Sequence, residues 1–209
     1  CSSKKLSFAT YYRTRLQNLG ESSKSDKSNG QQLWTKTTFD VFMTNNNSIK
    51  ILPLGGVGHF GKNMMVIESP QDITIIDAGV LFSKNSSGDL DLEIPDISYL
   101  TTTRKPIKEI LVTHGHEDHI GAIPYLAQQI GAPIFAPPMA IELIKSKLKE
   151  HRLLDSIVLE TIHLNTKIRL GLITAEPFQM CHSIPDSLGI ALHTQAGLII
   201  HTGDFKIDH

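Results

Sequence analysis

Four side chains of metal-binding type fall within six residues of the sequence, at His114, His116, Asp118 and His119. They directly follow the apolar segment Glu109–Thr113, which has the composition of a strand. Alternation along an extended chain places residues 114 and 116 on one side, and the turn that follows can aim residues 118 and 119 at a second point. Imidazole nitrogens suit zinc or manganese, whereas an aspartate oxygen suits a harder ion or a bridging position. The cluster therefore predicts a site for two metal ions.

Two further candidate ligands lie at the ends of other expected strands. His182 follows the segment Leu172–Gln179, and Asp204 follows the segment Leu198–His201. Because the first cluster also follows a strand, one edge of a sheet could gather all six side chains. Asp77 ends another expected strand, where a carboxylate can support a metal loop through hydrogen bonds without ligating the metal itself.

The glycine-rich run Gly55–Asn63 has two nucleotide-binding interpretations. Gly56, Gly58 and Gly61 match the spacing of a dinucleotide-binding loop, and the same run resembles a phosphate-binding loop. Both kinds of loop lead into a helix, but the next segment, Met64–Glu68, is apolar and strand-like. The run is therefore predicted to be a turn between two strands.

Short apolar segments bounded by Gly, Pro and Asp predict strands from Ser48 onward, and helical spacing of apolar residues predicts helices at Ile120–Ile130 and Pro138–Glu150. Strands come first, alternate with helices in the middle and return at the end. This order favours an α/β domain in which helices cover the outer face of a sheet. The expected strands are Ile49–Leu54, Met64–Glu68, Ile73–Ile76, Ile110–Thr113, Ile157–Leu159, Leu172–Gln179, Leu188–His193 and Leu198–His201.

The composition is that of one folded domain, since 40% of the 209 residues are hydrophobic and 20% are charged. No apolar stretch reaches the roughly 18 to 20 residues that a membrane helix needs, so we expect no membrane association. Two cysteines, Cys1 and Cys181, are too few for a disulfide framework, which favours a reducing compartment such as the cytoplasm. Residues 44–209 are net acidic, so charge alone disfavours an RNA ligand unless bound metal ions supply positive potential.

Residues 1–47 are rich in Ser, Lys, Asn, Thr and Gln and lack hydrophobic periodicity, which predicts a disordered extension before a folded domain at 48–209. The extension is basic and Ser-rich, so an organelle-targeting segment is the alternative to a cytoplasmic protein. The chain does not begin with Met, and its last strand-like segment stops at His209 without a closing element. We therefore expect a fragment of a longer protein.

These motifs resemble the metallo-β-lactamase superfamily and, within it, the ribonuclease J family, from Ile49 to the end of the chain. The metal-binding cluster has the superfamily's His-x-His-x-Asp-His pattern. One departure is His59, where the family usually has Glu. The passages that resemble ribonuclease J are Leu54–Gly58, Gly61–Asn63, Ile76–Gly79, Ile94–Leu100, His182–Ser187 and His201–Lys206.

The resemblance implies a metallo-β-lactamase αββα sandwich that is incomplete, because the chain corresponds to the N-terminal part and stops before the family's β-CASP domain. That downstream part supplies one more metal-ligating His and most of the RNA channel in the family. Asp77 takes the supporting role. The ligands implied are His114, His116 and His182 for one metal ion, Asp118 and His119 for the other, and Asp204 as the bridge between them.

The resemblance also implies a metal-dependent ribonuclease of RNA processing and decay, acting as a 5′-to-3′ exonuclease and as an endonuclease through a hydroxide activated by two metal ions. Asp118, His119 and Asp204 would be the catalytic residues, and zinc the metal, with manganese or magnesium as alternatives. The substrate would be single-stranded RNA with a 5′ monophosphate, and the full-length protein a homo-oligomer. The 209 residues alone would have little activity.

Two alternatives remain open at this point. The first is another hydrolase on the same scaffold, acting on a thioester, lactone or β-lactam, because a fold and its metal ligands do not fix the substrate. The second is a non-catalytic RNA-binding relative. Glu117 lies between ligands but is not assigned as a general acid, and the proton donor stays open.

Overall fold

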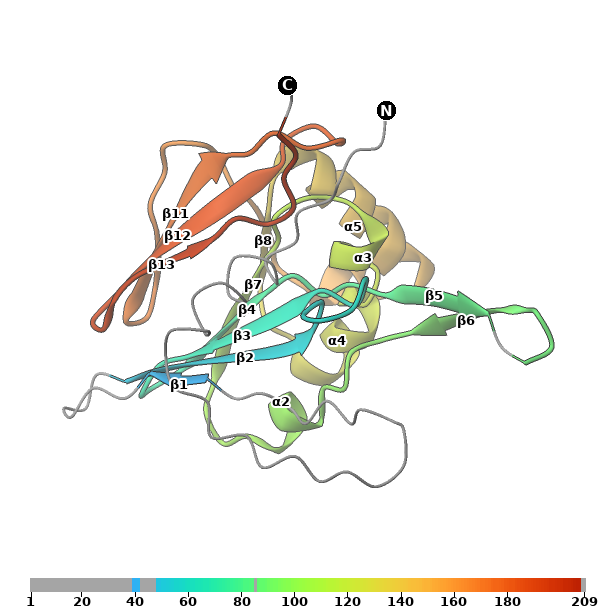
Figure 1. The fold of residues 1–209 in the computed structure, drawn as a ribbon, viewed down its shortest axis with the longest axis horizontal. Helices are drawn as coiled ribbons and strands as arrows, with labels where there is room; N and C mark the ends of the chain where they lie inside the picture. Colours follow the sequence, from blue (N-terminus) through green and yellow to red (C-terminus); the bar gives the residue numbers. More distant parts are fainter. Residues whose placement is uncertain (1–38, 42–47, 85, 208–209) are drawn as a thin grey trace.

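The computed structural model describes residues 39–41, 48–84 and 86–207. The expected extension 1–47 lies outside the described residues, apart from a three-residue strand that pairs with the first expected strand. The largest sheet has seven strands in the order β1-β2-β3-β4-β7-β8-β9 (Figure 1). These strands are β1 (Phe39–Val41), β2 (Ile49–Gly55), β3 (Met64–Glu68), β4 (Ile73–Ile76), β7 (Ile107–Leu111), β8 (Ile134–Ala136) and β9 (Leu159–Thr161).

Strands β1 to β4 pair antiparallel, and β4, β7, β8 and β9 pair parallel. The residues of β4 are all buried and those of β3 almost all, because both faces of the sheet are covered. The predicted bounds of these two strands are confirmed. β7 begins earlier than predicted, and Thr113 has already left the strand when the metal-binding cluster begins.

In the described part of the chain, four helices accompany the large sheet: α2 (Ser98–Thr102), α3 (Glu117–Ile120), α4 (Ile123–Ile130) and α5 (Pro138–Glu150). The predicted bounds of α5 are confirmed. The prediction of one helix over Ile120–Ile130 is wrong, because the helix is interrupted at Gly121 and Ala122. A Cβ at position 121 would lie 2.6 Å from a Val80 methyl group, and the Ala122 N–H donates to the Ala78 carbonyl. The break thus lets this segment pack against the loop after β4.

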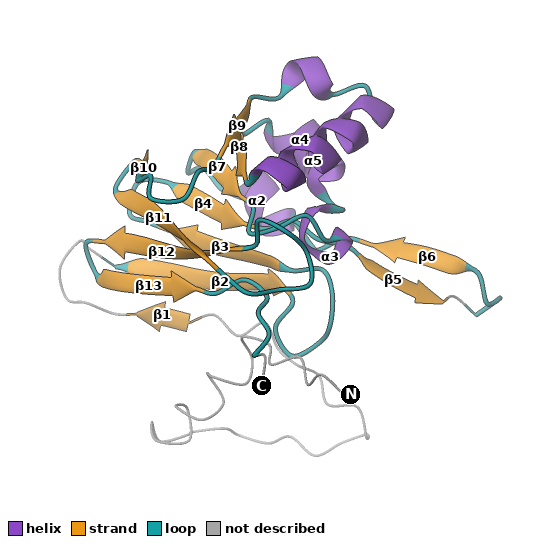
Figure 2. Ribbon diagram, turned by 90° about the horizontal axis from the view of Figure 1, so that it is seen from above, coloured by secondary structure: helices purple, strands orange, loops and turns teal. Residues whose placement is uncertain are grey.

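A second, antiparallel sheet contains β10 (Ile168–Leu170), β11 (Ile173–Gln179), β12 (Leu188–Thr194) and β13 (Gly197–His201). One apolar core lies between α4, α5 and the large sheet, and another lies between the two sheets. Figure 2 shows the helices and the second sheet on opposite faces of the large sheet. Among the described residues no helix covers the outer face of the second sheet, where Leu198 is 59% exposed. The layers are therefore those of the expected αββα sandwich without its outer helical layer.

Several short elements were not predicted from the sequence. Strands β5 (Leu81–Lys84) and β6 (Leu90–Glu93) form a separate hairpin that projects from the body of the protein (Figures 1 and 2). A 3-10 turn, η1 (Leu154–Ser156), precedes β9, which begins two residues later than the predicted strand. No helix in the described part of the chain is long and apolar enough to span a membrane.

Candidate metal centre

The predicted metal ligands follow strands of both sheets. His114, His116, His182 and Asp204 lie in loops, and Asp118 and His119 lie in the short helix α3. The main cluster follows β7, His182 follows β11 and Asp204 follows β13. The two sheets are joined at this point, because the Leu188 N–H at the start of β12 donates to the Thr113 carbonyl at 2.9 Å. The three loops therefore meet at one edge of the sandwich.

Three imidazole rings from two of these loops form the first group of converging donor atoms. His116 Nδ1 lies 3.0 Å from His114 Nε2 and 3.1 Å from His182 Nε2. Nitrogen ligands about 2.0 to 2.1 Å from a tetrahedral zinc ion are about 3.3 Å apart. The spacing of His114, His116 and His182 therefore fits one such ion, and the donor type fits zinc.

A second group of donor atoms contains His114, His119 and Asp204, whose ligand atoms all lie within 4.8 Å of one another. Asp204 lies between the two groups, since its Oδ1 is 3.5 Å from His119 Nε2 and its Oδ2 is 3.7 Å from His182 Nε2. Asp118 Oδ2 is 3.8 Å from His119 Nε2. All six predicted ligands are thus brought together. His114 belongs to both groups, a sharing that the sequence did not indicate.

The electrostatics of this site favour a cation beside His119. Burial alone would lower the pKa of this imidazole, but the Asp77 and Asp204 carboxylates raise it to about 10. Burial would likewise raise the pKa of Asp204, yet the hydrogen bond and charge of His119 hold that pKa well below its ordinary value. Two carboxylates around one buried imidazole make a point at which a proton or a metal ion is stabilised.

His114 shows the opposite behaviour. Burial lowers the pKa of His114 to about 3, and the neighbouring His119 contributes to that shift. The ring is 1% exposed and therefore stays neutral at physiological pH. A neutral imidazole is the form that ligates a metal ion, so this side chain meets a requirement of the proposed site.

Asp77 lies directly behind the candidate ligands. The residue is 1% exposed and adopts a left-handed conformation (φ 61°), which directs its carboxylate toward the loop after β7. It accepts hydrogen bonds from the Thr113 N–H at 2.8 Å and from the Thr113 hydroxyl, and one oxygen lies 2.8 Å from His119 Nδ1. With Nδ1 engaged in this way, His119 presents Nε2 to the centre.

The backbone around Gly79 packs closely against the ligand loop. A Cβ at Gly79 would lie 1.6 Å from the Asp118 carbonyl oxygen, so only glycine fits. The Ala78 N–H donates to the His119 carbonyl at 2.7 Å, and the Val80 N–H donates to the Glu117 carbonyl at 3.1 Å. These contacts hold α3, which carries Asp118 and His119, in one position.

Two residues near the centre were not among the candidates from the sequence. Asn63, the last residue of the glycine turn, lies against Asp118 and His119. His201 is the second, and its Nδ1 accepts a hydrogen bond from the Gly203 N–H at 3.2 Å. The only sequence signal for either was its place within the passages that resemble ribonuclease J. The glycine run itself is a turn between β2 and β3, as predicted, and no helix follows it.

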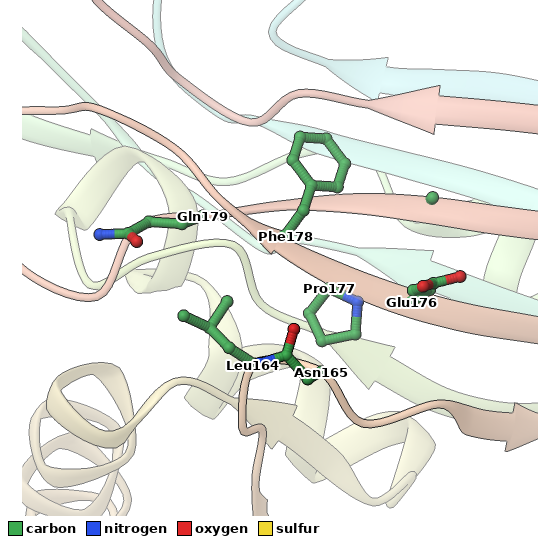
Figure 3. A pocket seen from close by; sticks show the side chains of 7 residues that line it. Leu164, Asn165, Glu176, Pro177, Phe178 and Gln179 are labelled. Atoms are coloured by element: carbon green, nitrogen blue, oxygen red, sulfur yellow. The ribbon is translucent and has the colours of Figure 1, made fainter.

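A pocket of about 490 Å³ lies apart from this centre, beside β11 (Figure 3). None of the predicted ligands borders it. It contains no group of metal-binding side chains, and the chemistry of the described residues is concentrated at the ligand loops. The residues that line it are Leu164, Asn165, Glu176, Pro177, Phe178, Gln179 and Ala191.

Comparison with known proteins gives one family and a consistent set of relatives. Residues 57–205 match the model of the metallo-β-lactamase superfamily. The chain is 46% identical to ribonuclease J of Helicobacter pylori over 163 residues. The alignment covers 78% of this chain and 24% of that protein. The chain is 42% identical over 162 residues to ribonuclease J 1 of Streptococcus pyogenes, covering 78% of this chain and 29% of the relative. The chain thus spans about a quarter of the length of these relatives.

Solved structures share the fold at low sequence identity. The metallo-β-lactamase fold protein YhfI of Bacillus subtilis aligns with a TM-score of 0.55 and 16% identity, over 76% of this chain and 63% of that chain. A protein of unknown function from Enterococcus faecalis aligns with a TM-score of 0.57 and 18% identity, over 75% of this chain and 43% of that chain. Identities this low show a common fold and nothing about the substrate.

Proposed function

Because this chain belongs to the metallo-β-lactamase superfamily, we propose that it carries the metal centre of a ribonuclease that hydrolyses RNA phosphodiester bonds. The observation that carries the proposal is the convergence of six donor side chains on one edge of the sandwich. Five of them form the two groups of donor atoms, with Asp204 between the groups, and Asp118 lies beside His119. The similarity to ribonuclease J over 78% of the chain supports RNA as the substrate.

The candidate ligands would hold two metal ions. His114, His116 and His182 would hold one divalent ion, zinc in the first instance and manganese or magnesium otherwise. His119 and Asp118 would hold a second, and Asp204 would contact both. Ions held in this way supply a nucleophile from water near neutral pH and stabilise the charge that develops on phosphorus.

The protein's own groups orient these ligands and set the charge at the centre. The Asp77 carboxylate orients the His119 ring and favours positive charge there, while burial keeps His114 neutral. The hydrogen bonds of Asp77 to Thr113 fix the start of the ligand loop. Asp118, His119 and Asp204 are the residues that we propose as catalytic, with Asp77 in support.

The finer activity that we propose rests on the resemblance to the ribonuclease J family. We propose 5′-to-3′ exonuclease and endonuclease action on single-stranded RNA with a 5′ monophosphate, in a homo-oligomeric protein of the cytoplasm. Residues 44–209 are net acidic, so bound cations would have to offset the repulsion between this surface and the phosphates.

Hydrolysis of a labelled 5′-monophosphorylated RNA by the metal-loaded full-length protein tests the proposal. We expect cleavage that disappears when Asp118 and His119 are both replaced by Ala, with the circular dichroism spectrum unchanged. Parallel assays with a thioester, a lactone and a β-lactam separate the nuclease from other hydrolases of this fold. Hydrolysis of one of these without cleavage of RNA would overturn the proposed substrate, and RNA binding without cleavage would indicate a non-catalytic relative.

A further inference from the structure

Asn63 joins three segments that build the metal centre. Its backbone N–H donates to the Asp118 carbonyl at 3.0 Å, and its own carbonyl accepts a hydrogen bond from the Gly79 N–H at 3.0 Å. The residue ends the glycine turn and lies directly before β3. The turn is therefore attached both to the ligand loop and to the segment after Asp77.

The side chain of Asn63 contacts the same ligands. Its Nδ2 lies 2.9 Å from the Asp118 carbonyl oxygen, 3.3 Å from Asp118 Oδ2 and 3.1 Å from His119 Nε2. A carbonyl and a carboxylate oxygen are acceptors only, so the atom that faces them must be the amide nitrogen, which donates. One amide group thus binds both the backbone and the carboxylate of Asp118.

Gly56 fixes the other side of this amide. A Cβ at position 56 would lie 2.2 Å from Asn63 Oδ1, so the amide oxygen packs directly against the glycine backbone. Gly56 also has a φ of 79°, which side chains rarely adopt. The amide is therefore held between the turn and Asp118. The glycines that resembled a nucleotide loop in the sequence make room for this side chain.

We propose that Asn63 is a positioning residue, which orients the Asp118 carboxylate for the second metal ion; this inference rests on the proposed metal centre. Asp118 is 18% exposed, and without the amide its carboxylate would be free to rotate. The hydrogen bond restricts that rotation before an ion arrives. Groups that orient a ligand from behind in this way typically change metal affinity by about 10- to 100-fold.

The test compares the affinities of the two ions in wild-type protein and in Asn63→Ala. Cobalt titration followed by absorption, with a competing chelator, resolves the two binding steps. We expect the second step to weaken about 10- to 100-fold and the first, at His114, His116 and His182, to stay as it is. A merely structural role would weaken both steps together and lower the melting temperature in the same proportion. Asn165→Ala, which removes an exposed asparagine from a turn that contacts none of the candidate ligands, is the control for the loss of an amide and should leave both steps unchanged.

Three results separate the possibilities. Selective loss of the second step in Asn63→Ala supports the positioning role. Equal affinities in wild type and variant, or equal weakening of both steps, would overturn it while leaving the proposed function intact. A wild-type protein that binds no cobalt would overturn the proposed metal centre, and the role of Asn63 with it.

Discussion

The Asp77 carboxylate lies 2.8 Å from Nδ1 of His119, and both side chains are almost completely buried. This contact determines which ring nitrogen faces the metal centre. An imidazole whose Nδ1 carries the shared proton offers the lone pair of Nε2 to a metal ion. Although burial would raise the pKa of Asp77, the His119 charge lowers it below the ordinary value. The carboxylate therefore stays ionised behind the ring.

Replacing Asp77 by Asn should move the ring proton of His119 from Nδ1 to Nε2. The amide can still accept from Thr113 through its oxygen, but its nitrogen would then donate to His119 Nδ1 and drive the ring proton to Nε2. Asn tolerates the left-handed conformation of this position, so the backbone should not be strained. We expect metal affinity to fall about 10- to 100-fold, as measured by chelator competition. The exposed Asp155→Asn is the control, and equal affinities for Asp77→Asn and wild type would contradict the assigned role.

The loop contact at Gly79 gives a second prediction. In Gly79→Ala the new methyl group meets backbone atoms of Asp118, which cannot move aside as a side chain could. We expect the free energy of unfolding to fall by roughly 3 kcal/mol or more, with loss of metal binding. Gly88→Ala introduces the same methyl group at a left-handed position with nothing within 4 Å, so it should cost only about 1 kcal/mol. Equal losses in urea unfolding of the two variants would exclude a special role for the close approach.

Some helices and strands could be predicted from the sequence and others could not. The bounds of β3, β4 and α5 were predicted correctly, because their apolar patterns match the burial that the fold imposes. The break at Gly121 was missed, since it depends on Val80, which lies about forty positions away. The β5 and β6 hairpin was missed because its apolar residues point into solvent, with Leu90 70% exposed, and give no sign of a core.

The candidate ligands were found from the sequence because metal-binding side chains cluster at strand ends. Their assignment to two separate metal ions was harder to predict. His114 lies in both donor groups, and Asp118 lies farther from His119 than Asp204 does. Asn63 was missed for a similar reason. Its contacts with Asp118 span 55 positions in the sequence, and only the folded chain brings the two together.

The stability of the chain should depend on pH through Glu109, a buried residue in the middle of β7. Burial raises the pKa of Glu109 to about 7, with a contribution from Asp72, while a hydrogen bond from Thr74 acts in the opposite direction. The folded state therefore binds a proton that the unfolded state, with a pKa of 4.5, releases earlier. This contribution is complete below pH 4.5 and is lost as the pH rises through about 7.

In Glu109→Gln that proton linkage is absent. Relative to wild type, the variant should gain stability as the pH rises from 4.5 to 7, by roughly 1 to 3 kcal/mol, and the difference should stay constant above that range. Urea unfolding at several pH values measures it, with the exposed Glu150→Gln as control. A difference that does not change with pH would show that Glu109 titrates normally.

Glu117 lies between candidate ligands, and its replacement tests whether it acts as a general acid. Lys147 on α5 contacts both of its carboxylate oxygens at 2.7 Å, and the Glu117 side chain is 50% exposed. An exposed ion pair of this kind contributes less than about 1 kcal/mol. We expect Glu117→Gln to hydrolyse RNA at the wild-type rate, whereas loss of a general acid would reduce the rate by roughly 10²- to 10⁴-fold. A decrease of that size would make Glu117 the missing proton donor.

The metal content of the protein tests the central claim most directly. After removal of metal by a chelator and titration with zinc or manganese, elemental analysis should find two ions per chain, and fewer when Asp118 and His119 are both replaced by Ala. The account predicts that RNA hydrolysis returns only as these ions bind. A protein that takes up no divalent ion at saturating concentration, or that cleaves RNA equally well without one, would contradict it.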